Sequence, residues 1–174
     1  MNGGNIVLIG MPGCGKSTCG VLLSKLVCKS FVDTDLVIQQ CEGRLLQQII
    51  NESGTEYFAR TEEKIISSLR LENSVIATGG SVVCYESAMN NLAKNAVIVY
   101  LKISYDGMMK RITNLSTRGI LLKNGETVRD MYNHRQALYE KYAQITVDCE
   151  EEAVEKNVEK IKNAYEKIIN QPGE

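Results

Sequence analysis

Apolar positions along the chain fall into two patterns, short continuous runs and longer stretches with helical spacing. The runs, which predict buried strands, cover residues 6–9, 30–33, 74–78, 96–101 and, more weakly, 145–148. Helical spacing is found in residues 18–28, 36–40, 45–51, 56–71, 127–143 and 153–170. Strands that alternate with helices in this way predict an α/β fold, in which helices cover both faces of a parallel sheet.

The ends of three predicted strands carry glycines and polar residues. Residues 10–18 follow the first strand, Asp33 and Asp35 stand at the end of the second, and Gly79 and Gly80 follow the third. Ligands of parallel α/β sheets bind at the carboxyl ends of the strands. We therefore expect these three segments to meet at one edge of the sheet and to form a binding site there.

The segment after the first strand reads Gly-Met-Pro-Gly-Cys-Gly-Lys-Ser-Thr and fits the phosphate-binding pattern G-x-x-x-x-G-K-[ST] in full. Its glycines let several backbone N–H groups turn toward a phosphate chain, and the following helix adds its positive N-terminal end. Lys16 supplies a mobile charge for the β- and γ-phosphates, and the Ser17 hydroxyl is placed to hold Mg²⁺. The segment therefore predicts a site for ATP and Mg²⁺.

Asp33 and Asp35 lie two positions apart at the end of the second strand, where both side chains are expected to point to the same side. Two adjacent carboxylates without a use would repel each other. Mg²⁺ and a hydroxylated substrate give them a use, because one can hold metal-bound water while Asp35 orients the attacking hydroxyl and accepts its proton. Capping by Asp35 of a helix that begins at Leu36 is a simpler interpretation, and it is compatible with catalysis.

Composition limits the class of protein. The chain has 174 residues, which fits one domain, and its net charge of −1 argues against nucleic-acid binding. Its six cysteines form no C-x-x-C pair, so we expect no zinc site. No apolar run has the length of a membrane span or a signal peptide, which predicts a cytoplasmic protein with reduced cysteines. Cys14 is expected to fill the loop as a small side chain rather than to serve a redox role.

Three further features are less specific. Residues 114–127 are polar and aperiodic, and in a phosphoryl-transfer enzyme such a loop is expected to close as a lid, with Arg118 adding positive charge. Gly79 and Gly80 permit close approach of the backbone to a ligand, although a tight turn explains them equally well. Arg135 is able to form a forked contact with a carboxylate, but taken alone it is typical of a solvated helix position.

Together these segments resemble the shikimate kinase family. Residues 33–35 match the family's D-[ST]-D motif, 77–80 its glycine run, 118–122 its lid, and 135–139 its R-x-x-L-Y segment. With the phosphate loop, five motifs stand in order, and the resemblance extends from the first strand to about Val147.

The resemblance implies a P-loop kinase of three α/β/α layers with a five-stranded parallel sheet in the order 2-3-1-4-5. One domain of residues 1–174 would contain substrate-binding helices at about 35–62 and a lid at about 114–127. The implied reaction transfers the γ-phosphate of ATP to the 3-hydroxyl of shikimate, in aromatic amino-acid biosynthesis, and the protein is expected to be a monomer.

The resemblance also assigns residues to roles. The implied catalytic residues are Lys16, Asp35 and Arg118. Those implied for ATP are Gly13, Cys14, Gly15, Lys16, Ser17, Thr18 and Arg118. Those implied for the substrate are Asp35, Gly79, Gly80 and Arg135, and Ser17 with Asp33, through water, would hold Mg²⁺.

The chain departs from the family at three positions. The arginine expected to clamp the substrate carboxylate is Ala59, and the neighbouring Arg60 is rotated by about 100° around the helix. The third glycine of the run is Ser81, and the proline after the lid arginine is Gly119. These departures leave open a kinase for another hydroxylated carboxylate, such as gluconate, and a nucleotide-binding module that has lost its substrate.

Overall fold

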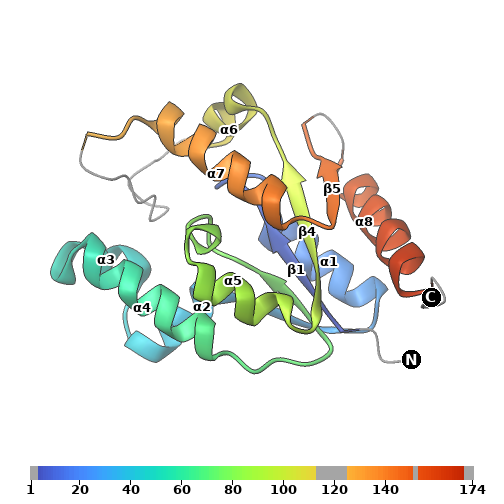
Figure 1. Ribbon diagram of the computed structural model, residues 1–174, viewed down its shortest axis with the longest axis horizontal. Helices are drawn as coiled ribbons and strands as arrows, with labels where there is room; N and C mark the ends of the chain where they lie inside the picture. The colour runs from blue at the N-terminus through green and yellow to red at the C-terminus, as the bar shows by residue number, and fades with distance from the viewer. Residues whose placement is uncertain (1–3, 113–124, 151–152, 171–174) are drawn as a thin grey trace.

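A five-stranded sheet forms the centre of the computed structural model, which describes residues 4–112, 125–150 and 153–170 (Figure 1). The strands are β1 (Asn5–Ile9), β2 (Ser30–Asp33), β3 (Ser74–Ala77), β4 (Ala96–Lys102) and β5 (Ile145–Asp148). Their spatial order is β2-β3-β1-β4-β5, and every neighbouring pair is parallel. The predicted α/β class and strand order are therefore confirmed.

Helices cover both faces of the sheet. They are α1 (Lys16–Leu26), α2 (Thr34–Glu42), α3 (Leu46–Ser53), α4 (Thr55–Ser68), α5 (Glu86–Ala93), α6 (Tyr105–Arg111), α7 (Val128–Tyr142) and α8 (Val154–Ile169), with a 3-10 turn η1 (Val82–Cys84). Helices α1 and α8 pack together on one face, and α5 and α7 lie on the other (Figure 1). This is the expected α/β/α sandwich.

The position of each strand explains its sequence pattern. All five residues of β1 are buried, because this strand is central and helices cover both of its sides. At the edge of the sheet, β5 buries Ile145 and Val147 and exposes Thr146 and Asp148. The alternation, in only four residues, is why this strand gives the weaker signal in the sequence.

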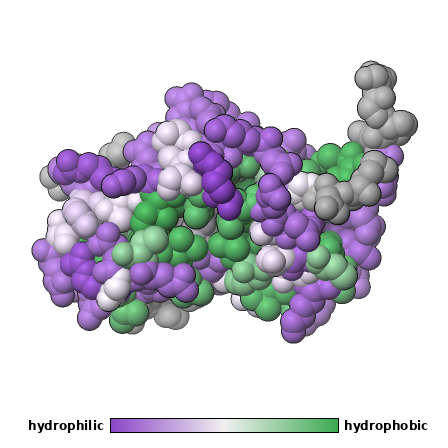
Figure 2. Space-filling model, turned by 90° about the horizontal axis from the view of Figure 1, so that it is seen from below, coloured by the Kyte–Doolittle hydropathy of each residue, from purple (hydrophilic) through white to green (hydrophobic). Residues whose placement is uncertain are grey.

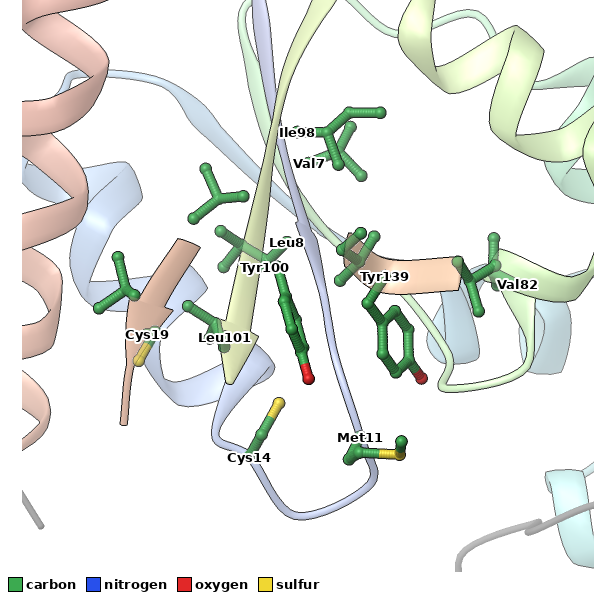
Figure 3. Packing of buried hydrophobic residues seen from close by; sticks show 14 of the residues in the cluster. Val7, Leu8, Met11, Cys14, Cys19, Val82, Ile98, Tyr100, Leu101 and Tyr139 are labelled. Atoms are coloured by element: carbon green, nitrogen blue, oxygen red, sulfur yellow. The ribbon is translucent and has the colours of Figure 1, made fainter. Parts of the chain in front are cut away.

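The main core continues beneath the loop that follows β1. Tyr100 of β4 stacks on Tyr139 of α7, with ring centroids 5.1 Å apart. Figure 3 shows these two rings side by side, with Met11 and Cys14 of the loop at the lower end of the cluster. Since Met11 and Cys14 are both buried, the loop is anchored to the core by its own side chains.

Helices α2, α3 and α4 have a small core of their own. Ile38, Ile49 and Phe58, one from each helix, are buried together, and this cluster is separate from the main one. These helices lie to one side of the sheet (Figure 1). They include the stretch of residues 35–62 that is expected to bind the substrate.

The surface offers no membrane-spanning element in the described ranges. None of the helices there is both long and apolar enough to cross a bilayer. The face in Figure 2 is mostly hydrophilic, with apolar patches between the polar side chains. Exposed apolar side chains such as Leu26, Leu36 and Leu45 come from different elements.

Candidate active site

A cavity of about 750 Å³ lies at the carboxyl ends of the strands. Among the predicted site residues, those that line it are Gly13, Gly15, Lys16, Ser17, Thr18, Asp33, Asp35, Gly79, Gly80 and Arg135. The side chain of Cys14, by contrast, does not line the cavity and is buried in the core beneath the backbone of the loop. Arg118, Gly119 and the lid segment 114–124 lie outside the described residues. The structure thus brings together three strand ends and a residue of α7, which are far apart in the sequence.

The phosphate loop is held open around the side chain of Lys16. Gly15 caps α1 with a φ of 97°, a left-handed conformation that favours glycine, and it lets the helix begin at Lys16. The Lys16 ammonium donates hydrogen bonds to the carbonyl oxygens of Gly10 at 2.8 Å and Met11 at 2.9 Å. The ammonium group is therefore hydrogen-bonded inside the loop, and phosphate oxygens must compete with these two carbonyl oxygens to bind it.

Asp33 and Asp35 do not share a strand, so this prediction was wrong. Asp33 ends β2 and caps α2, and its Oδ1 accepts a hydrogen bond of 3.0 Å from the backbone N–H of Asp35. The helix therefore begins at Thr34 rather than Leu36, because aspartate is a favoured capping residue, and Asp35 is not the cap. Both carboxylates still line the cavity, Asp33 at the strand end and Asp35 in the first helical turn.

The two residues expected to hold Mg²⁺ are in direct contact. The Ser17 hydroxyl, in the first turn of α1, donates a hydrogen bond of 2.7 Å to Asp33 Oδ2. Hydroxyl and carboxylate oxygens are hard ligands of the kind that Mg²⁺ prefers, and Mg²⁺ commonly takes only one or two protein ligands beside phosphate oxygens and water. The residues present therefore fit this ion.

Burial changes the acidity of Asp35. It raises the pKa of this carboxyl to about 6, with a further upward contribution from the charge of Asp33 and an opposing one from Lys16. A carboxyl group with a pKa near the working pH is well suited to accept a proton from a hydroxyl group. Asp35 thus lines the cavity with a carboxyl group that is able to accept a proton near neutral pH.

Gly79 and Gly80 are needed because other groups crowd them. A Cβ atom at Gly79 would lie 2.6 Å from Glu62 Oε1 and 3.0 Å from Asp35 Oδ1. One at Gly80 would lie 3.1 Å from Pro12 Cδ, with an Arg135 nitrogen at 3.4 Å, and the Gly80 carbonyl accepts a 2.6 Å hydrogen bond from the Tyr139 hydroxyl. Crowding by Glu62 and Asp35 at Gly79, and by Pro12 at Gly80, therefore favours glycine at both positions.

Arg135 is not the solvated residue that its sequence context suggested. Only 5% of it is exposed, and it lies on the buried face of α7 with Met131 and Tyr139, four residues before and after it. Its side chain lines the cavity next to Gly80. A buried arginine that reaches a cavity can form a forked contact with a carboxylate.

Arg60 does not take the place of the missing arginine. Its side chain is 79% exposed and pairs with Glu56 at 3.4 Å on the outer surface of α4. The described cations that line the cavity are Lys16, Arg111 and Arg135. Arg111, at the end of α6, was missed by sequence reasoning because nothing in its local pattern links it to the loop.

Glu62 is the other residue that sequence reasoning missed. It is 1% exposed, and its Oε2 accepts a 2.6 Å hydrogen bond from the Ser81 hydroxyl. A signal was present, since Glu62 stands between the buried residues Phe58 and Ile66 on the inner face of α4. A carboxylate in that stripe indicates a buried polar contact.

Comparisons with known proteins agree on one family. Residues 12–166 match the family model described as "SKI: Shikimate kinase". A shikimate kinase of Clostridium botulinum is 42% identical over 142 residues, which cover 79% of this chain and 83% of that protein. A shikimate kinase of Caldanaerobacter subterraneus is 33% identical over 167 residues, which cover 94% of this chain and 97% of that protein.

A solved structure shows the same fold. It is the shikimate kinase from Acinetobacter baumannii in complex with shikimate, with a TM-score of 0.84 and 26% sequence identity. The match covers 98% of this chain and 96% of that one.

Proposed function

The chain belongs to the shikimate kinase family, and we propose that its cavity uses the residues assembled there to pass the γ-phosphate of ATP to the 3-hydroxyl of shikimate. The protein is an ATP-dependent phosphotransferase of this family. The observation that carries the assignment of roles is that Lys16, Asp35 and Arg135 line one cavity. These three residues provide a cation for phosphates, a base for a hydroxyl group and a cation for a carboxylate.

The loop side of the cavity binds the nucleotide. The backbone of Gly13 to Thr18 surrounds the phosphates, and Lys16 exchanges the carbonyls of Gly10 and Met11 for phosphate oxygens. Ser17, with Asp33 through water, would hold Mg²⁺, which, when bound, neutralises charge on the phosphates. Arg118, from the lid at 114–127, adds positive charge to the transferred group.

The opposite side of the cavity binds shikimate. Asp35 orients the attacking hydroxyl and takes its proton, since burial raises the pKa of its carboxyl to about 6. Gly79 and Gly80 leave room for the substrate beside Asp35, and Arg135 holds the substrate carboxylate. We assign residues 35–62 and the lid at 114–127 to the same domain as this site.

An ADP-release assay tests the function. ADP is expected to form from MgATP only when shikimate is present, and to form far more slowly with gluconate. Turnover with gluconate but never with shikimate would overturn the substrate assignment. Nucleotide binding without turnover on any hydroxylated acid would instead support a module that has lost its substrate.

Ala59→Arg is expected to strengthen shikimate binding by roughly 10- to 150-fold, because a charge-assisted hydrogen bond contributes about 1.5–3 kcal/mol. Calorimetry with the wild type and the variant measures the change. Arg60→Ala is the matched control and should leave the affinity unchanged, since Arg60 pairs with Glu56 at the surface. An unchanged or lower affinity in Ala59→Arg would contradict the expectation and show that another residue already fills the role.

A further inference from the structure

Glu62 is a buried acid to which the mechanism above gives no role. It lies behind the cavity wall on α4, and its hydrogen-bond donor Ser81 lines the cavity. A buried carboxylate is unfavourable unless a cation or several hydrogen bonds compensate its charge. The groups around Glu62 therefore decide whether it carries a charge at all.

The neighbours of Glu62 supply little positive charge. Ser81 donates its 2.6 Å hydrogen bond, Tyr85 donates another, and both donors are neutral. Arg135 of α7 is the cation that acts on Glu62, whereas Asp35 of α2 adds a second negative charge. Glu62 Oε1 and Asp35 Oδ1 both lie within about 3 Å of the point where a Cβ of Gly79 would stand.

The other helices packed on α4 supply no further charge to Glu62 within the described contacts. Ser87 of α5 donates its hydrogen bond to Glu63, the next residue along α4. Ile49 of α3 packs with Phe58. The charge balance of Glu62 therefore rests on Arg135 and Asp35, and on its own protonation.

Position 59 lies three residues before Glu62, and residues at this spacing are neighbours on a helix surface. An arginine at that position would stand beside the Glu62 carboxylate and compensate its charge. Ala59 is partly buried and provides no charge, and the group that contacts Glu62 is the neutral hydroxyl of Ser81.

We propose that Glu62 is a positioning residue, oriented by its hydrogen bond from Ser81 and kept neutral and protonated by its burial beside Asp35, and that its proton cancels the buried charge that an arginine at position 59 would otherwise compensate. This inference rests on the proposed binding of the substrate carboxylate by Arg135. With Glu62 ionised, its charge opposes that of Arg135 and weakens the attraction for an anion. With Glu62 protonated, the charge of Arg135 acts on the substrate without that opposition.

The acidity of Glu62 agrees with this arrangement. Burial raises the pKa of its carboxyl to about 7 and Asp35 raises it further, against the hydrogen bonds from Ser81 and Tyr85 and the charge of Arg135. An anionic substrate favours the protonated form, so its binding raises the pKa of Glu62 again. Shikimate affinity is therefore high below about pH 7 and falls as the pH rises through that value.

Calorimetric titration of the full chain with shikimate, in the presence of MgADP, tests the role of Glu62 between pH 6 and pH 8.5. The wild-type affinity should fall about tenfold across this range, which corresponds to a rise of one unit in the pKa of Glu62 on binding. Glu62→Gln, which is neutral at every pH, should lose this dependence and bind about tenfold more tightly than wild type at pH 8.5.

Further variants separate this role from a structural one. Glu63→Gln is the matched control on the same helix and should keep the wild-type profile. Ser81→Ala should move the midpoint to higher pH, because it removes a hydrogen bond that lowers the pKa of Glu62. Ala59→Arg should move it to lower pH, since a nearby cation favours the carboxylate.

Two results would overturn the inference, and they are distinguishable. If shikimate is phosphorylated but its affinity in the wild type does not depend on pH, or Glu62→Gln keeps the wild-type dependence, the role of Glu62 is wrong while the proposed function stands. If shikimate does not bind at any pH, both fail. Thermal unfolding of each variant identifies loss of the fold, and the wild-type profile alone decides if Glu62→Gln does not fold.

Discussion

Asp35→Asn should lower kcat for shikimate phosphorylation by about 10²- to 10⁴-fold, the range that a positioned general base contributes. Asparagine has the same shape and can still orient a hydroxyl through its carbonyl oxygen, but it cannot take up the proton. Because Asp35 is assigned to the substrate hydroxyl and not to the phosphates, the KM for ATP should change little. Steady-state kinetics with both substrates varied measure the two effects.

The matched control for this substitution is Asp106→Asn. Asp106 is also in the first turn of a helix, α6, but it is exposed and does not line the cavity. The control should keep the wild-type rate. A rate for Asp35→Asn within tenfold of wild type would show that phosphoryl transfer here needs orientation of the hydroxyl but not a carboxylate base.

The second large effect is expected at Arg135. Arg135→Met should weaken shikimate binding by about 30- to 4,000-fold, because removing one partner of a buried, hydrogen-bonded charge pair costs about 2–5 kcal/mol. Methionine keeps part of the apolar stem but loses the fork that matches a carboxylate. The shikimate affinity of Arg135→Lys should lie between those of the wild type and Arg135→Met, since lysine provides a charge without the fork. Calorimetry with shikimate gives the affinities.

Arg129 provides the control on the same helix. It is exposed, and its guanidinium stacks 3.5 Å from the centre of the Tyr105 ring. Arg129→Met should therefore leave shikimate affinity unchanged, and thermal unfolding should show whether either variant loses stability. Equal losses of affinity in both variants would mean that the effect is one of helix stability and not of carboxylate binding.

Much of the fold was predictable because its signals are local. A buried central strand such as β1 must be apolar throughout, and the glycines and lysine of the loop stand at fixed spacing, so both are recognisable in a few residues. The rule that strand ends meet at one edge then predicted that Asp35 and Gly79 would approach the loop. Those residues do line one cavity.

The predicted start of α2 was wrong, and the reason is also local. Asp33 and Asp35 are both capable of capping a helix, and their sequence does not say which of them does so. The contact of Asp33 with Ser17 places Asp33 at the strand end, and the helix begins directly after it. Asp33 thus caps the helix with one carboxylate oxygen while the other accepts a hydrogen bond from Ser17, sixteen positions away in the sequence.

The sequence alone did not predict the burial and pairing of three side chains, those of Arg135, Glu62 and Arg60. Helical spacing shows which residues share a face, but burial and pairing depend on what another element places opposite that face. Arg135 is buried because α7 packs against the turn after β3, and the buried Glu62 receives its hydrogen bond from Ser81, nineteen residues away. The sequence was sufficient for the fold, the phosphate loop and the family, whereas the charge balance around the substrate carboxylate emerged only when distant elements packed together.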